Sequence, residues 1–425
     1  MLLRIIPIII TVIFFSSDAV ALWPVFHGNN QHNGLVDESG PSKPEVKWRF
    51  KGKGIFILHS PVVAKDGTIY LLKGDAWDYL TTEVIYALTK DGKVKWNYTR
   101  PELRFTPPVV YGDTVLAVAT SKTGKSGGYL ISLDSNEGKL KWEMRLSEYS
   151  TEGWVSHIVV DSRGRIYVRI GDVLGAFTSA GEKIWVYRTV MADRASQTRG
   201  PTLSPDEKTL YFHIPDERGL MAFDVETGSI IWKDATAYYN EWSSPVVGLD
   251  GTVYIIDTNT NSLYAIKPDG KHKWKVEFKA GEYTGNGMTA VSADGKTIYM
   301  TTESRDDITK MGIHGIIYAL DRDNGKIKWK YRFKESGEVA SPIAVDKNGR
   351  LYIGNGNGYV YCFDPEGGFL WKILVGYEVR EDRKGESGDD MRQIFMSGPV
   401  LSNDSLYIIT GKMNGISELV AIGRE

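Results

Sequence analysis

The chain has 425 residues, of which 42% are hydrophobic, and its formal net charge is −2 at pH 7. The hydrophobic content excludes an intrinsically disordered chain. The balance of charge, with no polybasic run, excludes the positive surface that nucleic acid or an anionic membrane attracts. We therefore expect a globular protein with no nucleic-acid partner.

Residues 1–21 predict a signal peptide. Arg4 supplies the positive charge, residues 5–15 are apolar, and Ala19-Val20-Ala21 is a small-residue cleavage site. The apolar run is shorter than the roughly 20 residues that a transmembrane helix needs. We expect a mature chain that begins at Leu22, is periplasmic, secreted or at the cell surface, and has no integral membrane segment after cleavage. An uncleaved membrane anchor remains the alternative.

The rest of the chain contains one unit repeated eight times. Its ending is a small residue, a turn and a tryptophan strand, as in AFDVETGSIIW (222–232) and ALDRDNGKIKW (319–329). A proline-containing strand and a tyrosine strand come before it, as in SPVVAKDGTIYLL (60–72). Short apolar stretches bounded by Gly, Asp and Asn predict four strands joined by hairpin turns. The repeated tryptophans are Trp48, Trp96, Trp142, Trp185, Trp232, Trp274, Trp329 and Trp371.

Four strands in a unit of about 45 residues are typical of a propeller blade. The sequence predicts an all-β, eight-bladed β-propeller of four-stranded blades, formed as a single domain by residues 22–425. The last unit ends after its third strand, and residues 46–50 provide a fourth strand without a unit of their own. We expect this N-terminal strand to pair with residues 418–422, complete the last blade and close the ring.

The repeated positions favour a structural interpretation. One tryptophan at the same place in each blade predicts a buried packing girdle between blades. The third strand carries a small residue at a fixed position: Ala87, Ser132, Ala176, Ala222, Ala265, Ala319, Cys362 and Ala421. Cys362 fills an alanine position, so we expect a buried structural thiol, and a chain with one cysteine forms no intrachain disulfide.

The ending A-x-D-x-x-x-G-K-x-x-W, preceded by the S-P-x-x-x-x-D-G-x-x-Y element, resembles the tryptophan-docking repeat of pyrroloquinoline-quinone-type propellers. WPVFHGNNQHNG (23–34) is similar to the lead-in before the first blade of that family. The resemblance extends from Trp23 to Glu425 and implies the same fold. The family contains quinone-dependent alcohol dehydrogenases, the outer-membrane assembly lipoprotein and secreted propellers that bind no quinone, so fold alone does not imply function.

The dehydrogenases of that family carry two adjacent cysteines, and Glu, Asn and Asp as calcium ligands beside the quinone. The single cysteine excludes the first feature, and we find no motif for the second. The assembly lipoprotein carries a lipidated cysteine that this chain lacks. We therefore expect no cofactor, with pyrroloquinoline quinone and calcium as the alternative.

The two faces of the predicted ring differ. Tight turns such as KDG and DNGK join the first to the second strand and the third to the fourth, on what we name the tight-turn face. On the opposite, long-loop face the connections are irregular: 73–84, 147–156, 188–199, 235–243, 302–315 and 376–396. Aromatic and arginine side chains in such loops are typical of binding sites for proteins, and aromatic rings also suit sugars. The candidate ligand-binding residues are Trp154, Arg199, Tyr239, Trp242 and Arg392.

These features predict a non-catalytic, extracytoplasmic binding or assembly propeller that recognises a protein segment or a glycan on its long-loop face. The alternatives are a quinone-dependent dehydrogenase with an atypical site and a glycan-active enzyme. We assign no catalytic or metal-binding residue. The DRDNG turn (321–325) lacks the later acidic ligand of a calcium loop, and the seven histidines show no metal-ligand spacing. The loop aromatics have a structural alternative, which is packing among themselves to cap the ring.

Overall fold

The structure of the protein is a computed structural model. It describes residues 24–25, 27–51, 60–74, 83–122, 128–146, 156–170, 173–188, 200–214, 219–236, 244–284, 288–307, 310–334, 341–376, 394–412 and 417–424. The predicted signal peptide lies outside the described residues, and its cleavage stays a prediction. Within the described part of the chain, no apolar helix has the length needed to cross a bilayer.

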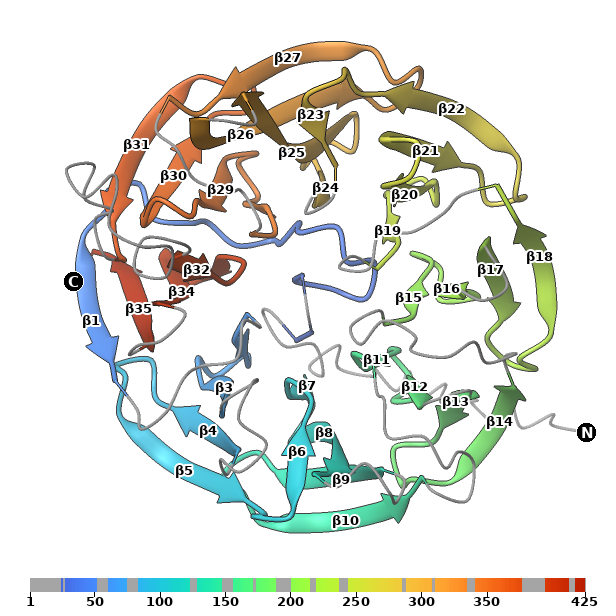
Figure 1. The fold of residues 1–425 in the computed structure, drawn as a ribbon. Coiled ribbons are helices and arrows are strands. Elements are labelled where there is room, and N and C mark those ends of the chain that lie inside the picture. Colours follow the sequence, from blue (N-terminus) through green and yellow to red (C-terminus); the bar gives the residue numbers. More distant parts are fainter. Residues whose placement is uncertain are drawn as a thin grey trace, which may run out of the picture.

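The described strands form eight antiparallel sheets arranged as blades around a central axis (Figure 1). In each blade the strands follow one another from the axis outwards, so the tryptophan strand lies at the rim. This arrangement confirms the predicted eight-bladed propeller.

The blades are numbered in chain order. Blades 1 and 2 comprise β2 (Val62–Val63), β3 (Ile69–Lys73), β4 (Val84–Leu88), β5 (Val94–Thr99); and β6 (Leu103–Phe105), β7 (Val109–Tyr111), β8 (Thr114–Ser121), β9 (Tyr129–Asp134), β10 (Leu140–Arg145). Blades 3 and 4 comprise β11 (Val159–Val160), β12 (Ile166–Ile170), β13 (Val173–Phe177), β14 (Lys183–Arg188); and β15 (Thr202–Leu203), β16 (Thr209–Ile214), β17 (Gly219–Asp224), β18 (Ile230–Asp234). Blades 5 and 6 comprise β19 (Val246–Val247), β20 (Val253–Asp257), β21 (Ser262–Ile266), β22 (His272–Glu277); and β23 (Glu282–Tyr283), β24 (Thr289–Val291), β25 (Thr297–Asp307), β26 (Lys310–Asp321), β27 (Ile327–Arg332). Blades 7 and 8 comprise β28 (Ala344–Val345), β29 (Leu351–Gly354), β30 (Tyr359–Phe363), β31 (Phe369–Leu374); and β32 (Ile394–Met396), β33 (Val400–Ser402), β34 (Ser405–Lys412), β35 (Ser417–Gly423), β1 (Val46–Phe50).

The small residue of the third strand lies opposite the tryptophan in every blade. Ala222 pairs with Trp232 and Cys362 with Trp371, and the other six blades repeat the pairing. A register shift beside each tryptophan marks a β-bulge, which sharpens the twist of the outer strand. The repeat in the sequence is therefore a repeat of cross-strand geometry.

The tryptophans join neighbouring blades. The ring of Trp96 lies against the turn glycine Gly138 of blade 2, where a Cβ would come within 2.5 Å of the indole. The indole nitrogens also donate to carbonyl oxygens in the next blade: Trp48 to Lys90, Trp96 to Ser135, Trp185 to Val225, Trp232 to Pro268, Trp274 to Arg322 and Trp329 to Pro365, over 2.8–3.0 Å. These contacts confirm the predicted girdle between blades.

The predicted full burial of the girdle is wrong for six of its eight members. Trp96 and Trp185 are 8% exposed, whereas the others are only half-buried. The outer strand forms the rim of its sheet, so one edge of the indole faces solvent between two blades. Most of the largest fully buried side chains are instead tyrosines of the second strand, such as Tyr167, Tyr211 and Tyr299, which lie beside the tryptophans.

Closure of the ring follows the prediction. β1 pairs antiparallel with β35, with Trp48 opposite Ala421 and Phe50 opposite Leu419. Arg49 donates to the carbonyl oxygen of Val375 in blade 7 and forms an ion pair with Glu418 at 3.0 Å. The first described strand of the chain thus completes the last blade and links it to its neighbour.

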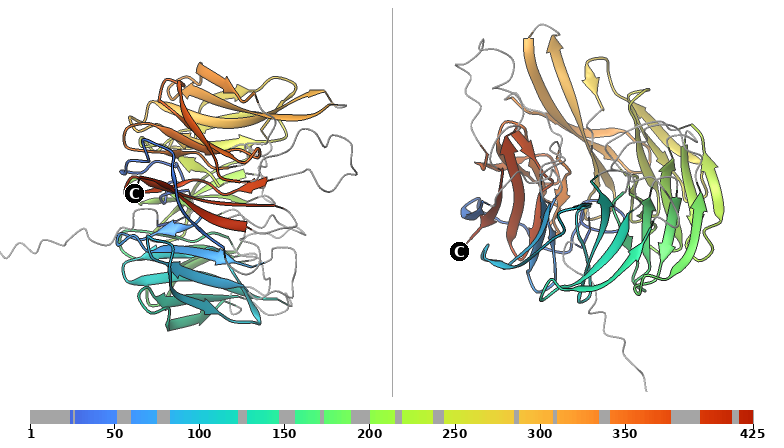
Figure 2. Two further views of the ribbon diagram at one scale, coloured as in Figure 1. Left: turned by 90° about the vertical axis from the view of Figure 1, so that its left-hand side faces the viewer. Right: turned by 60° about the horizontal axis from the view of Figure 1, so that its bottom comes forward.

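Two features of the blades were not predicted. The innermost strand is divided in blades 2, 6 and 8, where β6, β23 and β32 extend the sheet towards the long-loop face. Residues 302–315, predicted as an irregular loop, lie almost wholly in β25 and β26, which form a long hairpin that projects beyond the ring (Figure 2). Here the extra length continues the sheet, because it keeps the register from Thr302–Ile316 to Arg305–Ile313.

Candidate functional site

The five candidate ligand-binding residues lie outside the described residues. Trp154 belongs to the connection between β10 and β11, Arg199 to that between β14 and β15, and Arg392 to that between β31 and β32. Tyr239 and Trp242 follow β18. Their role in binding therefore stays a prediction.

The tight-turn face has uniform local structure. In blades 1, 3, 5 and 7 the first turn closes with the same pair of backbone hydrogen bonds, as in Ala64 N to Thr68 O and Gly67 N to Ala64 O. Asp side chains cap the turns by accepting backbone N–H groups, as Asp134 does from Asn136 and Glu137. In the DRDNG turn Asp321 accepts from Asp323 and Asn324 in the same way, which is a structural role.

The centre of the ring at this face is occupied by the chain's own N-terminal residues. We name residues 24–25 and 27–40 the axial segment; it crosses the middle of the ring in blue in Figure 1. Its carbonyl oxygens accept backbone N–H groups from five innermost strands: Pro24 from Val110, Asn30 from Leu203, Gln31 from Val247, Asn33 from Val291 and Gly34 from Val345, over 2.8–3.1 Å. The main chain of the axial segment therefore contacts five blades.

Carboxamide side chains of the axial segment add further contacts. Asn30 donates to the carbonyl oxygen of Val160 in blade 3 over 2.6 Å, and Asn33 donates to that of Val247 over 3.1 Å. Asn29 holds the segment's own shape, because its Oδ1 accepts from Gln31 N and Asn33 N. The lead-in motif noted in the sequence is thus a connector between blades, a role that no repeat in the sequence signalled.

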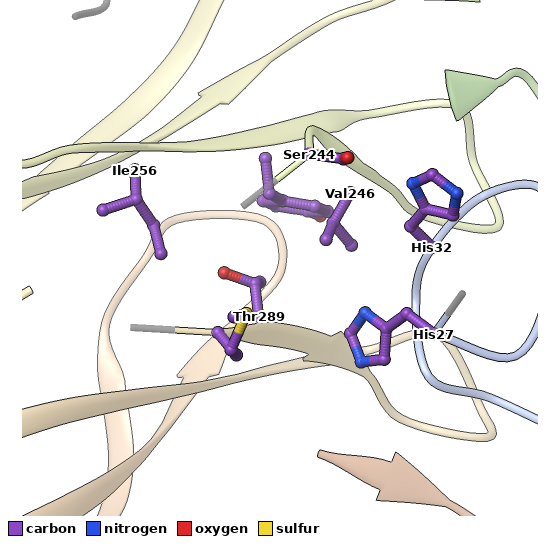
Figure 3. A pocket seen from close by; sticks show the side chains of 8 residues that line it. His27, His32, Ser244, Val246, Ile256 and Thr289 are labelled. Carbon is purple, nitrogen blue, oxygen red and sulfur yellow. The ribbon is translucent and has the colours of Figure 1, made fainter. Parts of the chain in front are cut away.

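Two histidines of the axial segment point into one cavity (Figure 3). The cavity volume is about 10 Å³, room for about one water molecule, and Ser244, Val246, Tyr254, Ile256, Met288 and Thr289 complete its lining. The sequence showed no reason to bring His27 and His32 together. Their side chains are almost fully buried, with exposed fractions of 3% and 1%.

The hydrogen bonds of these histidines define their neutral forms. Nε2 of His27 lies 3.0 Å from the carbonyl oxygen of Ile343, which can only accept, so Nε2 carries the proton. The hydroxyl of Thr202 donates to Pro245 O, so it accepts from Nδ1 of His32 at 3.1 Å. Burial lowers the pKa of His27 to about 4. Burial, with the charge of His27 as the smaller cause, lowers the pKa of His32 to about 3.

The sequence lacks one feature of the quinone site of the family's dehydrogenases, the pair of adjacent cysteines. Cys362 is the only cysteine in the sequence, so it cannot form the adjacent-cysteine disulfide. It is buried opposite Trp371, and burial raises the pKa of its thiol to about 12, which leaves it unreactive at neutral pH. In the described ranges no three His, Cys, Asp or Glu side chains gather closely enough to hold a metal ion.

Eight blades joined by tryptophan docking and closed by an N-terminal strand define a tryptophan-docking propeller. The chain belongs to the family described as outer membrane protein assembly factor BamB, whose model matches residues 40–234, 126–331 and 313–421. This finding agrees with the resemblance seen in the repeats.

Individual relatives are distant. The chain is 23% identical over 345 residues to a quinoprotein ethanol dehydrogenase of Pseudomonas aeruginosa, covering 68% of this chain and 51% of that protein. It spans about half to two thirds of the length of the curated relatives it matches. Among solved structures, quinohemoprotein alcohol dehydrogenase from Comamonas testosteroni superimposes with a TM-score of 0.68 at 12% identity, covering 95% of this chain and 81% of that one. BamB from Moraxella catarrhalis superimposes with a TM-score of 0.57 at 14% identity, covering 89% and 99%. These likenesses show the fold.

Proposed function

We propose that the protein is a non-catalytic, extracytoplasmic scaffold that binds an extended protein segment on its long-loop face. The observation that carries the proposal is the axial segment, which fills the centre of the tight-turn face. A ligand approaching there meets innermost strands whose N–H groups at Val110, Leu203, Val247, Val291 and Val345 are already bonded. The long-loop face is the end of the ring that the axial segment does not cover.

The described strands support the same face. The extensions β6, β23 and β32 lengthen three blades towards it, and the β25–β26 hairpin projects from it (Figure 2). At the base of the hairpin Tyr283 is 50% exposed and pairs with Glu303. A half-exposed tyrosine beside a projecting hairpin is the kind of anchor that protein partners use.

Family membership favours a protein segment over a glycan. The matching family is described as an outer membrane protein assembly factor, so binding to other protein chains is the activity that its description implies. Together with the predicted signal peptide at residues 1–21, the description also supports a location outside the cytoplasm.

The test compares the two faces with defined probes. Purified protein is applied to an array of extended peptides with alternating apolar and polar residues, and to an array of oligosaccharides. We expect saturable binding to peptides, weakened by Arg199→Glu with Arg392→Glu and by Trp154→Ala with Trp242→Ala. The matched control changes Lys93, Lys139 and Lys271 to Glu on the tight-turn face, where the last two form only exposed ion pairs. If the control variant loses binding while the loop variants bind normally, the assignment of binding to the long-loop face is wrong.

A second arm separates binding from catalysis. The protein is titrated with pyrroloquinoline quinone and calcium and assayed for dye-linked alcohol oxidation. Saturable quinone uptake with turnover would overturn the scaffold proposal in favour of a dehydrogenase. Binding to oligosaccharides alone would redirect it to a glycan.

A further inference from the structure

We propose that the innermost strands form a peptide-binding ring at the tight-turn end of the axis, which the chain's own N-terminal segment occupies in cis. The ligand class is an extended peptide that presents successive carbonyl oxygens and carboxamide side chains. This site lies opposite the long-loop face, and its existence does not depend on the function proposed for that face.

The ring consists of equivalent groups. The donors Val110, Leu203, Val247, Val291 and Val345 occupy one register position, because the residue before each pairs with the same position of its second strand: Val109 with Leu116, Thr202 with Tyr211, Val246 with Tyr254, Ala290 with Tyr299 and Ala344 with Tyr352. Backbone groups alternate in direction along a strand, so the N–H group at this position points away from the sheet. Any propeller blade with a strand at the axis offers such an edge, and an edge with open donors is a template for another chain.

The axial segment contacts successive blades with almost one residue for each blade. The carbonyl oxygens of Asn30, Gln31, Asn33 and Gly34 accept from blades 4, 5, 6 and 7 in that order. The residues of the segment therefore contact the blades in the order in which both occur along the chain. A peptide in this site is recognised by its main chain, as in strand addition, but around a circle rather than along a line.

Side chains give the site its selectivity. Blade 3 presents a carbonyl oxygen at the equivalent residue, Val160, and it is met by the side-chain amide of Asn30. Gln31 donates to the carbonyl oxygen of Ser204 over 3.3 Å. Gly34 has a φ of +70°, and a Cβ there would lie 2.2 Å from the carbonyl oxygen of Ile343. The site thus accepts glycine at this position and selects carboxamides before it.

The link from the axial segment to the blades is a tether. Ser42 and Lys43 are exposed between the segment and β1. The contacts that hold the segment are hydrogen bonds and packing, including the fully buried Val25 against the core of blades 2 and 3. The segment should therefore stay in its site when the tether is cut.

The experiment cuts the tether after folding. A protease recognition sequence is inserted between Ser42 and Lys43 in the chain that begins at Leu22, and the purified protein is cleaved. We expect the N-terminal fragment to remain with the propeller through gel filtration, and to exchange with a fluorescent peptide of residues 24–40 in a saturable manner. Asn33→Leu and Gly34→Ala should release the fragment about tenfold faster or more, because each removes or strains a contact with the ring. Ser42→Ala is the matched control and should change nothing.

Two results would overturn the proposal. In one, the fragment separates at once while tryptophan fluorescence and circular dichroism show the propeller unchanged, so the ring has no affinity of its own. In the other, cleavage itself abolishes cooperative melting, so the segment acts as a covalent part of the fold. Fluorescence polarisation with the propeller freed of its fragment gives the second measurement: no binding of the 24–40 peptide to a folded ring contradicts the site directly.

Discussion

The eight repeats and the N-terminal residues 24–50 hold the same ring together by different means. Between repeats, one contact is copied: a tryptophan rests on the turn glycine of the next blade, as Trp329 does on Gly367. Among the N-terminal residues, Trp48 of β1 makes this same contact with Gly92 of blade 1. The axial segment has no such repeat: its carbonyl oxygens and side chains contact successive blades, from blade 2 at Pro24 to blade 7 at Gly34. Trp371 of blade 7 is the exception. Blade 8 takes its third and fourth strands from opposite ends of the chain, so it has no turn between them for this tryptophan to contact.

The comparison teaches that repetition builds the blades but cannot complete the ring. A copied contact is lost one blade at a time, whereas the N-terminal contacts serve blades 2 to 8 together. A substitution in one repeat should therefore lower the free energy of unfolding through the contacts of one blade. A change in the N-terminal residues should affect the contacts of many blades at once.

The largest effect should come from removing residues 22–50. This deletion takes away both the axial segment and β1, which leaves the edge of β35 unpaired and the innermost N–H groups of several blades without their acceptors. We expect aggregation or loss of a cooperative melting transition, measured by differential scanning calorimetry. An unchanged melting curve would show that the repeats close the ring without the N-terminus.

The next effect concerns a copied contact. Trp329→Ala should lower the free energy of unfolding by about 3 kcal/mol, the lower part of the range for large aromatic truncation, because the indole is only half-buried. Trp371→Ala should cost less, about 2 kcal/mol, since no turn of blade 8 rests on it. Denaturant unfolding measures both, with the exposed Lys326→Ala as control. A larger loss at Trp371 would mean that the seam is the tighter junction.

A pH effect of intermediate size should come from the buried histidines of the axial segment. The pKa of His27 in the folded protein is about 4, below its ordinary value of 6.5, so the unfolded chain binds the proton first as pH falls. Its neutral form therefore stabilises the fold fully above pH 6.5, and that stability is lost as pH falls towards 4. At pH 5 the loss is about 2 kcal/mol per histidine. Unfolding at pH 7 and pH 5 should differ less in His27→Gln than in the unchanged protein, and equal differences would contradict the assignment.

The smallest effect should be at the closure itself. Glu418 is buried and forms ion pairs with Arg49 and Lys51, whose side chains are 35% and 62% exposed. Solvent screens these partners, so Glu418→Gln should lower the free energy of unfolding by only about 1 kcal/mol. A double-mutant cycle with Arg49→Met measures the coupling. A coupling near zero would mean that the Arg49–Glu418 ion pair adds nothing to the closure of the ring.

Much of the fold could be predicted because the pattern of one blade recurs eight times in the sequence. The fixed positions of Ala222 and Trp232 are visible in the repeat, and the missing fourth strand of the last unit points to residues 46–50. The axial segment could not be predicted in the same way. The hydrogen-bond partners of Asn30, Asn33 and His27 lie in different blades and come close only in the assembled ring. No local sequence pattern therefore reveals these contacts.

The candidate binding residues show the same limit from the other side. Trp154, Arg199, Tyr239, Trp242 and Arg392 were chosen for residue type and loop position, and the described residues do not test that choice. The β25–β26 hairpin shows why length alone misleads. Residues 302–315 looked like a loop because they exceed a blade's usual strands, but alternating pairs such as Thr301–Ile317 and Glu303–Gly315 continue the ladder.

The pairing of β1 with β35 also sets an order of events during synthesis. The strand made near the beginning must wait, unpaired, until the last residues of the chain exist, since its partners are Leu419 to Ile422. Contacts this distant in sequence form slowly, and the intermediate is an open arc of blades with an apolar flank at each end. Every molecule therefore passes through a stage in which it can aggregate with other copies of the chain. A chain that ends a few residues early never leaves that stage.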